Sequence, residues 1–323
     1  GMYRAMVLTR TFDAKAVALQ RTGRLGTFAS SLGQEGVAVG IGTAMSPDDV
    51  LIPAFREQGA MFLRGVTPTE LLLYWGGDER GSDFAGPRHD FPICVSVGSH
   101  AAHAVGAALA LQLDRRPAAA VCVMGDGATS RGEVYSAMNY AGVRGLPVVF
   151  VVTNNQFAIS VPRSRQTAAE TLAQKALGVG IRGEQVDGND VIAVKARVEE
   201  ALARARSGAG PTLIEALTYR LADHTTADDA SRYRADEEVS RQWQFDPLVR
   251  MRSHLADAHG WSGDDENALL ASCNRQIEGA ADEYLATPPS EPTVMFDVVH
   301  EVMPEALSGQ RADVETWMRA DDG

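Results

Sequence analysis

Two oxygen-bearing side chains lie just beyond apolar segments in the middle of the 323-residue chain. Asp126 follows the run at residues 119–124, and Asn155 follows the run at residues 147–153. Short apolar runs bounded by polar residues or glycine predict buried strands. Carboxylate and amide oxygens are hard ligands of the kind that Mg²⁺ and Ca²⁺ prefer. The two residues therefore predict a divalent-cation site.

Glycines beside Asp126 favour an anion at the same place. Gly125 and Gly127 leave room for a bulky group to approach the main chain. The amides at the start of a helix predicted at residues 132–143 would also favour negative charge. Because Mg²⁺ usually bridges carboxylates and phosphates, we expect a metal ion joined to a diphosphate.

The segments around these residues predict a parallel sheet. The strand, helix and second strand span about 35 residues, which is typical of a βαβ unit with a right-handed crossover. Ligands of parallel α/β sheets bind outside the carboxyl ends of the strands. Adjacent strands would therefore bring Asp126 and Asn155 side by side.

The rest of the chain predicts helices on both faces of this sheet and a helical end. We expect helices at residues 2–25, 33–45, 168–177 and 191–207, and further strands at 49–53, 184–186 and 212–217. Beyond residue 236 the pattern is helical, at 237–243, 247–259 and 264–284. The predicted fold class is α/β, with a domain at residues 1–235 and a helical C-terminal extension at 236–323 packed on it.

Composition excludes several classes of protein. The net charge is -12, with 30 Lys and Arg against 42 Asp and Glu, which argues against a nucleic-acid surface. Cys94, Cys122 and Cys273 are far apart and show no CxxC spacing, so a reducing compartment is expected. The longest apolar stretch, residues 101–113, is too short to cross a bilayer. The first residues lack signal-peptide regions. We expect a cytoplasmic protein with no nucleic-acid or membrane partner.

A glycine pattern typical of dinucleotide-binding proteins, GxGxxG, occurs at residues 178–183. That motif requires a strand before it and a helix after it. Here a helix is predicted before the glycines and a short strand after them. The pattern indicates a glycine-rich helix end, and a nicotinamide oxidoreductase is disfavoured.

The spacing of Gly-Asp-Gly, 26 residues and Asn-Asn is the signature of thiamine diphosphate enzymes. Residues 125–162, GDGATSRGEVYSAMNYAGVRGLPVVFVVTNNQFAISVP, resemble the E1 α subunits of pyruvate and branched-chain 2-oxo acid dehydrogenases. Similar motifs are TLAQKALGVGIRGEQVDG at 171–188, GPTLIEA at 210–216, YRLADHTTADDASRYR at 219–234, GQEG at 33–36 and FRE at 55–57. The resemblance covers nearly the whole chain, more loosely beyond about residue 265.

The resemblance implies thiamine diphosphate and Mg²⁺ as cofactors. It implies that Mg²⁺ is bound by Asp126, Asn155 and the main-chain carbonyl of Phe157. Arg56 would bind the terminal phosphate, because a planar guanidinium suits an anion, and Val97 would be the apolar wedge that keeps the cofactor bent. The cofactor-binding residues implied are Phe55, Arg56, Val97, Gly125, Asp126, Gly127, Ala128, Asn155, Arg220 and His224.

His224 is the implied catalytic residue, a proton donor at neutral pH. The loop around it would be ordered by Arg220, Asp228, Tyr233 and Arg234. The alternative for His224 is a solvated loop histidine.

Other positions are open or depart from the family pattern. His100 and His103 lie on a predicted helix and are interpreted as supporting residues. Phe55 stands where tyrosine is common, and Thr153 stands where some members have arginine. Thr225 occupies the place of a regulatory serine in some relatives.

The resemblance also implies partners. In this family the carboxylate beside the pyrimidine ring comes from a β subunit, and no second parallel-sheet domain is predicted here. We therefore expect an E1 β subunit in an α₂β₂ assembly, and transfer of the acyl group to the lipoyl domain of an E2 acyltransferase.

The substrate is left open by the sequence. The loop at residues 224–229 has the length of branched-chain relatives, which favours branched-chain 2-oxo acids over pyruvate, with acetoin as a third possibility. A non-catalytic assembly subunit is the remaining alternative, motivated by Phe55, His100 and Thr153.

Overall fold

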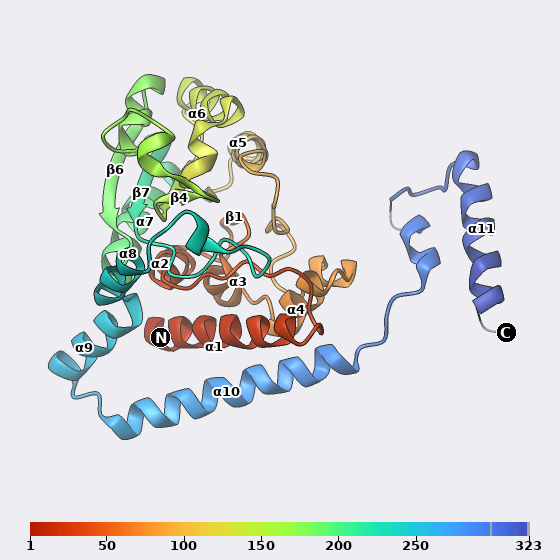
Figure 1. The fold of residues 1–323 in the computed structure, drawn as a ribbon. Helices are drawn as coiled ribbons and strands as arrows, with labels where there is room; N and C mark the ends of the chain where they lie inside the picture. Colours follow the sequence, from red (N-terminus) through yellow and green to blue (C-terminus); the bar gives the residue numbers. More distant parts are fainter. Residues whose placement is uncertain (298, 322–323) are drawn as a thin grey trace. The chain divides into compact units, whose positions relative to one another are not determined.

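The computed structural model describes residues 1–297 and 299–321. The chain divides into two compact units, Gly1–Tyr284 and Leu285–Gly323. The first unit contains all the strands (Figure 1). This division lies further along the chain than the change to a helical pattern near residue 236. A domain boundary at residue 235 stays a prediction.

The first unit is built on a five-stranded parallel sheet of order β1-β2-β3-β7-β6. The strands are β1 (Val50–Ile52), β2 (Ala120–Gly125), β3 (Val148–Asn154), β7 (Thr212–Leu217) and β6 (Arg182–Asp187). All seven residues of the central strand β3 are buried. Because both faces of such a strand are covered, it reads as a continuous apolar run. A separate hairpin pairs β4 (Phe157–Ala158) with β5 (Val161–Pro162).

Helices make up most of the remaining chain. The α-helices are α1 (Met2–Arg21), α2 (Glu35–Ala44), α3 (Gln58–Leu63), α4 (Pro68–Gly76), α5 (His100–Leu113), α6 (Gly132–Arg144), α7 (Val191–Arg206), α8 (Asp236–Gln242), α9 (Pro247–His259), α10 (Gly263–Ala286) and α11 (Glu305–Asp321). The 3₁₀ helices are η1 (Glu79–Ser82), η2 (Asp126–Ser130), η3 (Arg163–Arg165), η4 (Ala173–Val179), η5 (Ala230–Arg232), η6 (Trp243–Phe245) and η7 (Pro292–Phe296).

Local sequence explains where several helices begin and end. The Asp190 side chain accepts hydrogen bonds from two amides of the first turn of α7, and Asp246 does the same for α9. Helix α4 begins with a capping box between Thr67 and Glu70. Each such cap contributes roughly 1 kcal/mol. Helix α6 ends at Gly145, whose φ of 60° is cheap only for glycine.

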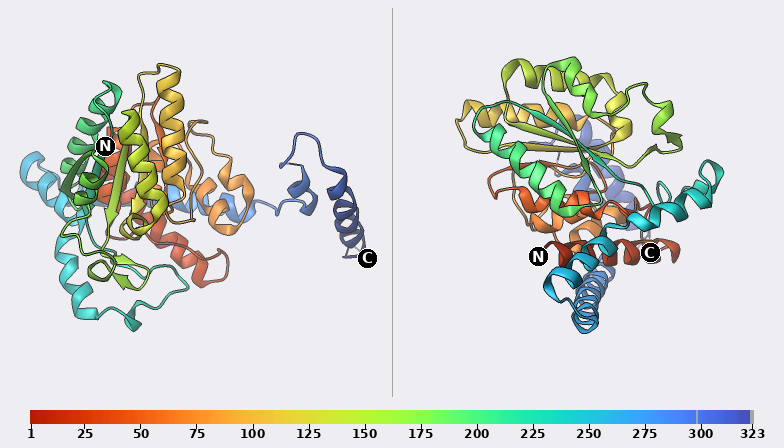
Figure 2. Two further views of the ribbon diagram at one scale, coloured as in Figure 1. Left: turned by 90° about the horizontal axis from the view of Figure 1, so that it is seen from above. Right: turned by 90° about the vertical axis from the view of Figure 1, so that its left-hand side faces the viewer.

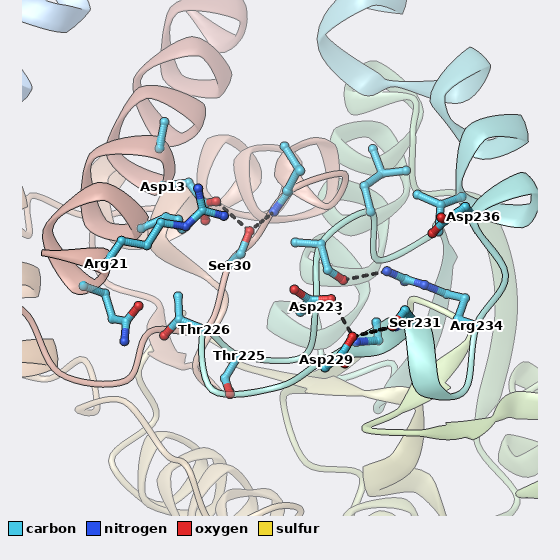
Figure 3. A pocket seen from close by; sticks show the side chains of 18 of the residues that line it. Asp13, Arg21, Ser30, Asp223, Thr225, Thr226, Asp229, Ser231, Arg234 and Asp236 are labelled. Carbon is cyan, nitrogen blue, oxygen red and sulfur yellow. Dashed lines mark hydrogen bonds between the residues drawn. The ribbon is translucent and has the colours of Figure 1, made fainter. Parts of the chain in front are cut away.

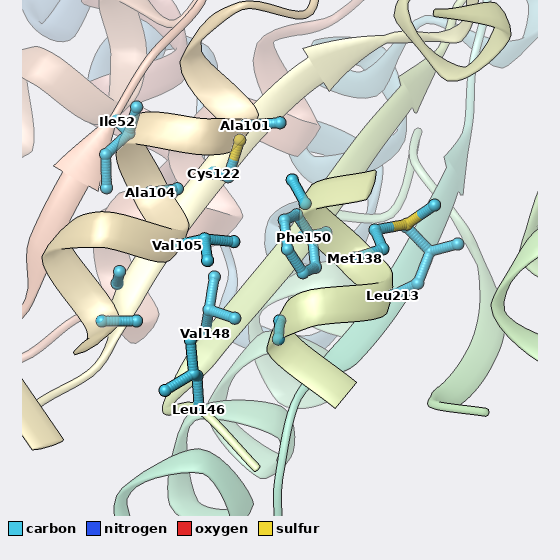
Figure 4. Close-up of a cluster of buried hydrophobic side chains, with 14 of the residues drawn as sticks. Ile52, Ala101, Ala104, Val105, Cys122, Met138, Leu146, Val148, Phe150 and Leu213 are labelled. Atoms are coloured by element: carbon cyan, nitrogen blue, oxygen red, sulfur yellow. The ribbon is translucent and has the colours of Figure 1, made fainter. Parts of the chain in front are cut away.

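Helices cover both faces of the sheet, as predicted (Figure 2). On one face α5 and α6 pack on β1, β2 and β3, and Figure 4 shows Val105 and Met138 against Cys122 and Phe150. On the other face α7 packs on β3, β6 and β7, and α2 packs closely on α7. Gly40 permits this approach, because a Cβ there would lie 2.6 Å from a methyl carbon of Val194. The predicted α/β fold class is confirmed.

Two predicted elements need correction. Residues 168–172 are not helical, and only the short 3₁₀ helix η4 follows them. The first helix ends at Arg21 and not at residue 25, because Gly23 has a φ of 71° that ends the helix. The other predicted helices and strands lie within a few residues of their expected places. The GxGxxG pattern at 178–183 lies between η4 and β6, so no dinucleotide-binding turn is formed there.

The second unit contains η7 and α11. The helical character predicted for the end of the chain is therefore confirmed in its described part. No helix among the described residues is both long enough and apolar enough to cross a membrane.

Candidate active site

The candidate site is built at the carboxyl ends of three neighbouring strands. Strand β2 runs directly into η2, which begins at Asp126, and β3 ends one residue before Asn155. The two strands are parallel neighbours with Gly125 opposite Thr153. Strand β7, on the other side of β3, leads to Arg220. The prediction that adjacent strands present Asp126 and Asn155 at one edge of the sheet is confirmed.

Asp126 is a buried carboxylate without an ion-pair partner among the described residues. Only 2% of the residue is exposed, and the Gln166 amide donates a hydrogen bond of 2.8 Å to its Oδ2. Asp126 forms no ion pair with any residue in the described part of the chain. Burial raises the pKa of the Asp126 carboxyl. A buried, unpaired charge is costly, and a bound metal ion would offset that cost.

Asn155 is buried next to Asp126 and is held by a glutamine. Its Nδ2 donates to Gln34 Oε1 at 2.9 Å, while its Oδ1 accepts from the amide of Phe157 at 3.3 Å. Gln156, with a φ of 74°, makes the tight turn between them. The Nε2 of Gln34 is buried without a hydrogen-bond partner in the described structure. An unpaired buried donor of this kind fits an oxygen-rich ligand.

Two of the predicted metal ligands, Asn155 and Phe157, thus lie in the turn after β3, and the third, Asp126, lies in the turn after β2. The carbonyl of Phe157 accepts a hydrogen bond of 3.4 Å from Arg220. Among the residues described, no group of three His, Cys, Asp or Glu side chains could hold a metal. The predicted set differs in kind, because it combines one carboxylate with neutral amide and carbonyl oxygens, the ligands typical of Mg²⁺.

The two glycines beside Asp126 have different surroundings. A Cβ at Gly125 would meet nothing within 4 Å, so this position is open as expected. A Cβ at Gly127 would lie 2.6 Å from the Cβ of Ala158. The small residue at position 127 is therefore required by the packing of η2 against β4, and not only by an incoming anion. Ala128 is buried beside it.

Two buried arginines meet at His224. The Nη2 of Arg56 lies 3.0 Å from His224 Nδ1 and donates to the His224 carbonyl at 2.6 Å. The Nη1 of Arg220, which is fully buried, lies 3.5 Å from the same Nδ1. Burial and the Arg220 charge lower the pKa of Arg56 to about 10. Paired guanidinium groups that repel one another are suited to binding an anion between them.

This arrangement fixes the protonation of His224. Arginine only donates, so Nδ1 of His224 must accept and its proton must lie on Nε2. Burial, followed by the charges of Arg56 and Arg220, lowers the pKa of His224 to about 4. The imidazole is therefore neutral at pH 7, and the proton that it could donate lies on Nε2; the role of proton donor stays a prediction.

The loop that carries His224 is ordered by the residues predicted for that role. Asp228 accepts hydrogen bonds from the His224 amide, at 3.0 Å, and from the Tyr233 hydroxyl. The Tyr233 hydroxyl in turn accepts from Arg220 at 2.8 Å. Arg234 donates to the carbonyls of Arg220 and Ala222. These bonds link the loop back to the end of β7.

The low pKa of His224 predicts a pH effect on stability. In the unfolded chain the imidazole takes up a proton near pH 6.5, whereas in the folded chain it does so only near pH 4. The free energy of unfolding should therefore fall as the pH is lowered from about 6.5 to about 4. Urea unfolding at pH 7 and pH 5 should show a smaller loss for His224→Gln than for the wild type. An equal loss in both proteins would contradict this assignment.

The remaining predicted residues lie around the arginines and the start of α5. The Phe55 ring stands edge-on to His224, with centroids 6.1 Å apart, and the Arg56 guanidinium lies 5.1 Å from that ring. Val97, just before α5, is 47% exposed. His100 is buried with Nε2 2.8 Å from the carbonyl of Val123, and His103 stacks on Phe91. These contacts agree with supporting roles for both histidines.

Two large cavities lie near the candidate site but do not contain its acidic and amide ligands. One of about 770 Å³ lies between α1 and the loop after β7, and Figure 3 shows Asp13, Thr225 and Asp229 on its walls. A second of about 620 Å³ lies beside Tyr219. Neither is lined by Asp126 or Asn155. The second cavity is lined by Phe157, and the candidate site is identified here by the chemistry at the strand ends.

Several residues of the site were not predicted from the sequence. Gln166 holds Asp126, and Gln34, known only as part of the GQEG motif, holds Asn155. Lys175 donates to Thr129 at the end of η2. Gln166 and Lys175 lie 40 and 46 residues away from their partners, so no local pattern could have revealed these contacts.

The fold and the site define an α/β enzyme with a buried carboxylate, a buried amide and an arginine cluster at the strand ends. A family model described as "Dehydrogenase E1 component" matches residues 3–293. The α subunit of 3-methyl-2-oxobutanoate dehydrogenase from Mycobacterium tuberculosis (strain ATCC 25618 / H37Rv) is 41% identical over 321 residues, 99% of this chain and 88% of its own.

Two other relatives are E1 α subunits of pyruvate dehydrogenase. The Staphylococcus aureus (strain N315) protein is 39% identical over 94% of this chain and 83% of its own. The Mycoplasma pneumoniae protein is 37% identical over 97% of this chain and 88% of its own. The chain belongs to the dehydrogenase E1 component family, as the E1 α subunit of a 2-oxo acid dehydrogenase. The resemblance in the sequence is thereby confirmed.

Proposed function

We propose that this subunit uses thiamine diphosphate and Mg²⁺ for the oxidative decarboxylation of a 2-oxo acid and the reductive acylation of an E2 lipoyl group. The observation that carries the proposal is the buried, unpaired carboxylate of Asp126 next to Asn155 at the strand ends. The paired guanidinium groups of Arg56 and Arg220 supply the matching anion site nearby.

The residues divide into a metal group and an anion group. Asp126, Asn155 and the Phe157 carbonyl would hold Mg²⁺, and Arg56 would donate to the terminal phosphate. When bound, the cofactor supplies the stabilised carbanion that decarboxylation requires. Arg220 holds the Phe157 carbonyl and steadies the loop through Tyr233.

His224 acts through its Nε2 proton. Because the arginines occupy Nδ1, the Nε2–H group is the only donor that the ring can present to a substrate oxygen. A neutral N–H group held in place can stabilise negative charge that develops on a substrate oxygen. Filling the anion site would reduce the positive field on the ring and would raise the pKa of His224 from its value near 4.

We also propose that the site is completed by a β subunit in an α₂β₂ assembly in the cytoplasm. The described part of the chain contains one parallel sheet. Asp126 is the proposed metal ligand, and we assign no other carboxylate of this chain to the place beside the pyrimidine ring of the cofactor. The relatives' names as α subunits support such a partner. The loop from Asp228 to Arg234 is a candidate contact for the lipoyl domain.

The preferred substrate is a branched-chain 2-oxo acid. The length of the loop at residues 224–229 supports it, while identities of 41% and 39% to a branched-chain and a pyruvate enzyme do not separate the two. Pyruvate and acetoin are the other substrates to be tested. A non-catalytic subunit is opposed by the intact Asp126, Asn155, Arg56 and His224.

The test is turnover by the chain co-expressed with its β partner, with thiamine diphosphate, Mg²⁺ and an artificial electron acceptor. We expect kcat/KM for 3-methyl-2-oxobutanoate to exceed that for pyruvate by at least ~10-fold, the discrimination that added methyl groups provide in an apolar pocket. A preference for pyruvate would overturn the choice of substrate. Turnover of neither acid with cofactor bound would favour acetoin, and no Mg²⁺-dependent binding would favour a non-catalytic subunit.

A further inference from the structure

Lys175 is a buried cation without a carboxylate partner. Only 8% of this residue is exposed, and it forms no ion pair with any residue that the structure describes. Its Nζ donates to the carbonyl and to the hydroxyl of Thr129, both at 2.8 Å. Burial, followed by the charge of Arg163, lowers the pKa of Lys175. An unpaired buried ammonium is costly, so its place in the structure calls for a compensating role.

Thr129 connects this lysine to the candidate metal site. The residue lies in η2, is 2% exposed, and donates from its hydroxyl to the carbonyl of Asp126 at 2.7 Å. Lys175 therefore holds both polar groups of the residue that closes the turn on Asp126. A displacement of Thr129 would move the main chain of Asp126 directly.

Glu215 ties η4, the 3₁₀ helix that carries Lys175, to the other side of the site. It is fully buried on β7 and accepts a hydrogen bond of 2.6 Å from the side chain of Asn154, the residue before Asn155. Its other oxygen accepts from the amide of Ala173, at 3.0 Å, at the start of η4. One carboxylate thus joins β7, the end of β3 and η4.

Helix η4 is consequently bound to both turns that carry the predicted metal ligands. Lys175 connects it to Asp126 through Thr129, and Glu215 connects it to the residue before Asn155. We infer that η4 is a brace that fixes the separation of Asp126 and Asn155, with Lys175 and Glu215 as its positioning residues. The inference rests on the proposed function, because it concerns the same metal site.

The test compares variants of the α₂β₂ complex in the binding of thiamine diphosphate at several Mg²⁺ concentrations. In Lys175→Met we expect the dissociation constant to rise by ~10–100-fold, as for groups that support metal ligands. Lys175→Arg should restore most of the affinity. Thr129→Val, which keeps the residue's shape and removes the hydroxyl, should also weaken binding. Lys195→Met, on α7 where the partly exposed Lys195 pairs with Glu199, is the matched control.

Hydrogen exchange in the cofactor-free complex gives a second readout. Amides at residues 126–131 should exchange faster in Lys175→Met and in Glu215→Gln than in the wild type. The double variant Lys175→Met/Glu215→Gln should bind thiamine diphosphate about as well as the weaker of the two single variants, because both changes disrupt the same brace.

Two failures are distinguishable. Wild-type affinity and wild-type exchange in Lys175→Met and Thr129→Val would overturn the brace. A wild-type complex that binds no cofactor would instead overturn the proposed function. If Lys175→Met does not fold, Thr129→Val decides the question, and wild-type affinity together with wild-type exchange in that variant would overturn the brace.

Discussion

Replacement of Asp126 by Asn is expected to abolish Mg²⁺-dependent binding of thiamine diphosphate and, at the same time, to stabilise the cofactor-free protein. The carboxylate is 2% exposed and has no ion-pair partner in the described residues, so in the cofactor-free protein it is a buried charge without a direct ion pair. Asparagine keeps the shape and an oxygen for Gln166. It removes the negative charge on which a divalent cation depends, so the affinity loss should exceed the ~100-fold typical of supporting residues.

The sign of the stability effect follows from the raised pKa of Asp126. A carboxyl that resists ionisation in the folded state destabilises the fold at pH values above its ordinary pKa and ceases to do so at acid pH. The asparagine variant should therefore need more urea to unfold than the wild type at pH 7 without cofactor, and the difference should shrink towards pH 4. Asp114→Asn, at the exposed end of α5, is the control. Lower stability of the variant at pH 7 would contradict the assignment.

Calorimetry of the α₂β₂ complex tests the predicted loss of thiamine diphosphate binding in Asp126→Asn. Wild-type complex should bind thiamine diphosphate only when Mg²⁺ is present, and Asp126→Asn should show no heat under either condition. Retention of Mg²⁺-dependent binding by this variant would remove Asp126 from the metal site.

The elements that were predicted best are those whose sequence pattern fits only one type of secondary structure. Strands β2 and β3 are buried on both faces, so their residues form unbroken apolar runs that no amphipathic helix would show. Helix α6 between them ends at a glycine in the left-handed region. Once these elements are known, the rule that ligands bind at the carboxyl ends of parallel strands brings Asp126 and Asn155 together.

The contacts that support those residues could not be predicted, since they join distant parts of the chain. Glu215 stands within an apolar strand, and its sequence neighbours give no sign that it accepts hydrogen bonds from Asn154 and Ala173. The segment before η4 reads as helical because alanine and leucine favour helices. In the structure the amide of Ala173 is held by Glu215 instead, and a tertiary contact thus overrides local propensity.

The lowered pKa of His224 could not be predicted from the sequence either. Histidine in a loop has an ordinary pKa near 6.5, and only the spatial approach of Arg56 and Arg220 lowers it to about 4. Both arginines were predicted to bind the cofactor, but their contact with Nδ1 was not.

Replacement of His224 by Gln is expected to lower kcat by ~10²–10⁴-fold, the range associated with loss of a positioned proton donor. Thiamine diphosphate affinity should change little, because the predicted metal ligands are untouched and the carbonyl at position 224, which accepts from Arg56, is retained. The loss should therefore appear in kcat and in kcat/KM alike. His254→Gln, on the exposed part of α9, is the control and should keep wild-type rates.

The measurement is steady-state turnover of the α₂β₂ complex together with calorimetric cofactor binding. A variant that loses cofactor affinity in proportion to activity would show that His224 organises the anion site and does not act on the substrate. A pH profile separates these roles further. If a neutral Nε2–H group is the donor, wild-type activity should not follow a histidine titration with a pKa of about 6.5. A rate that falls as pH rises through that value would instead require the imidazolium form, with the bound anion overcoming the effect of Arg56 and Arg220.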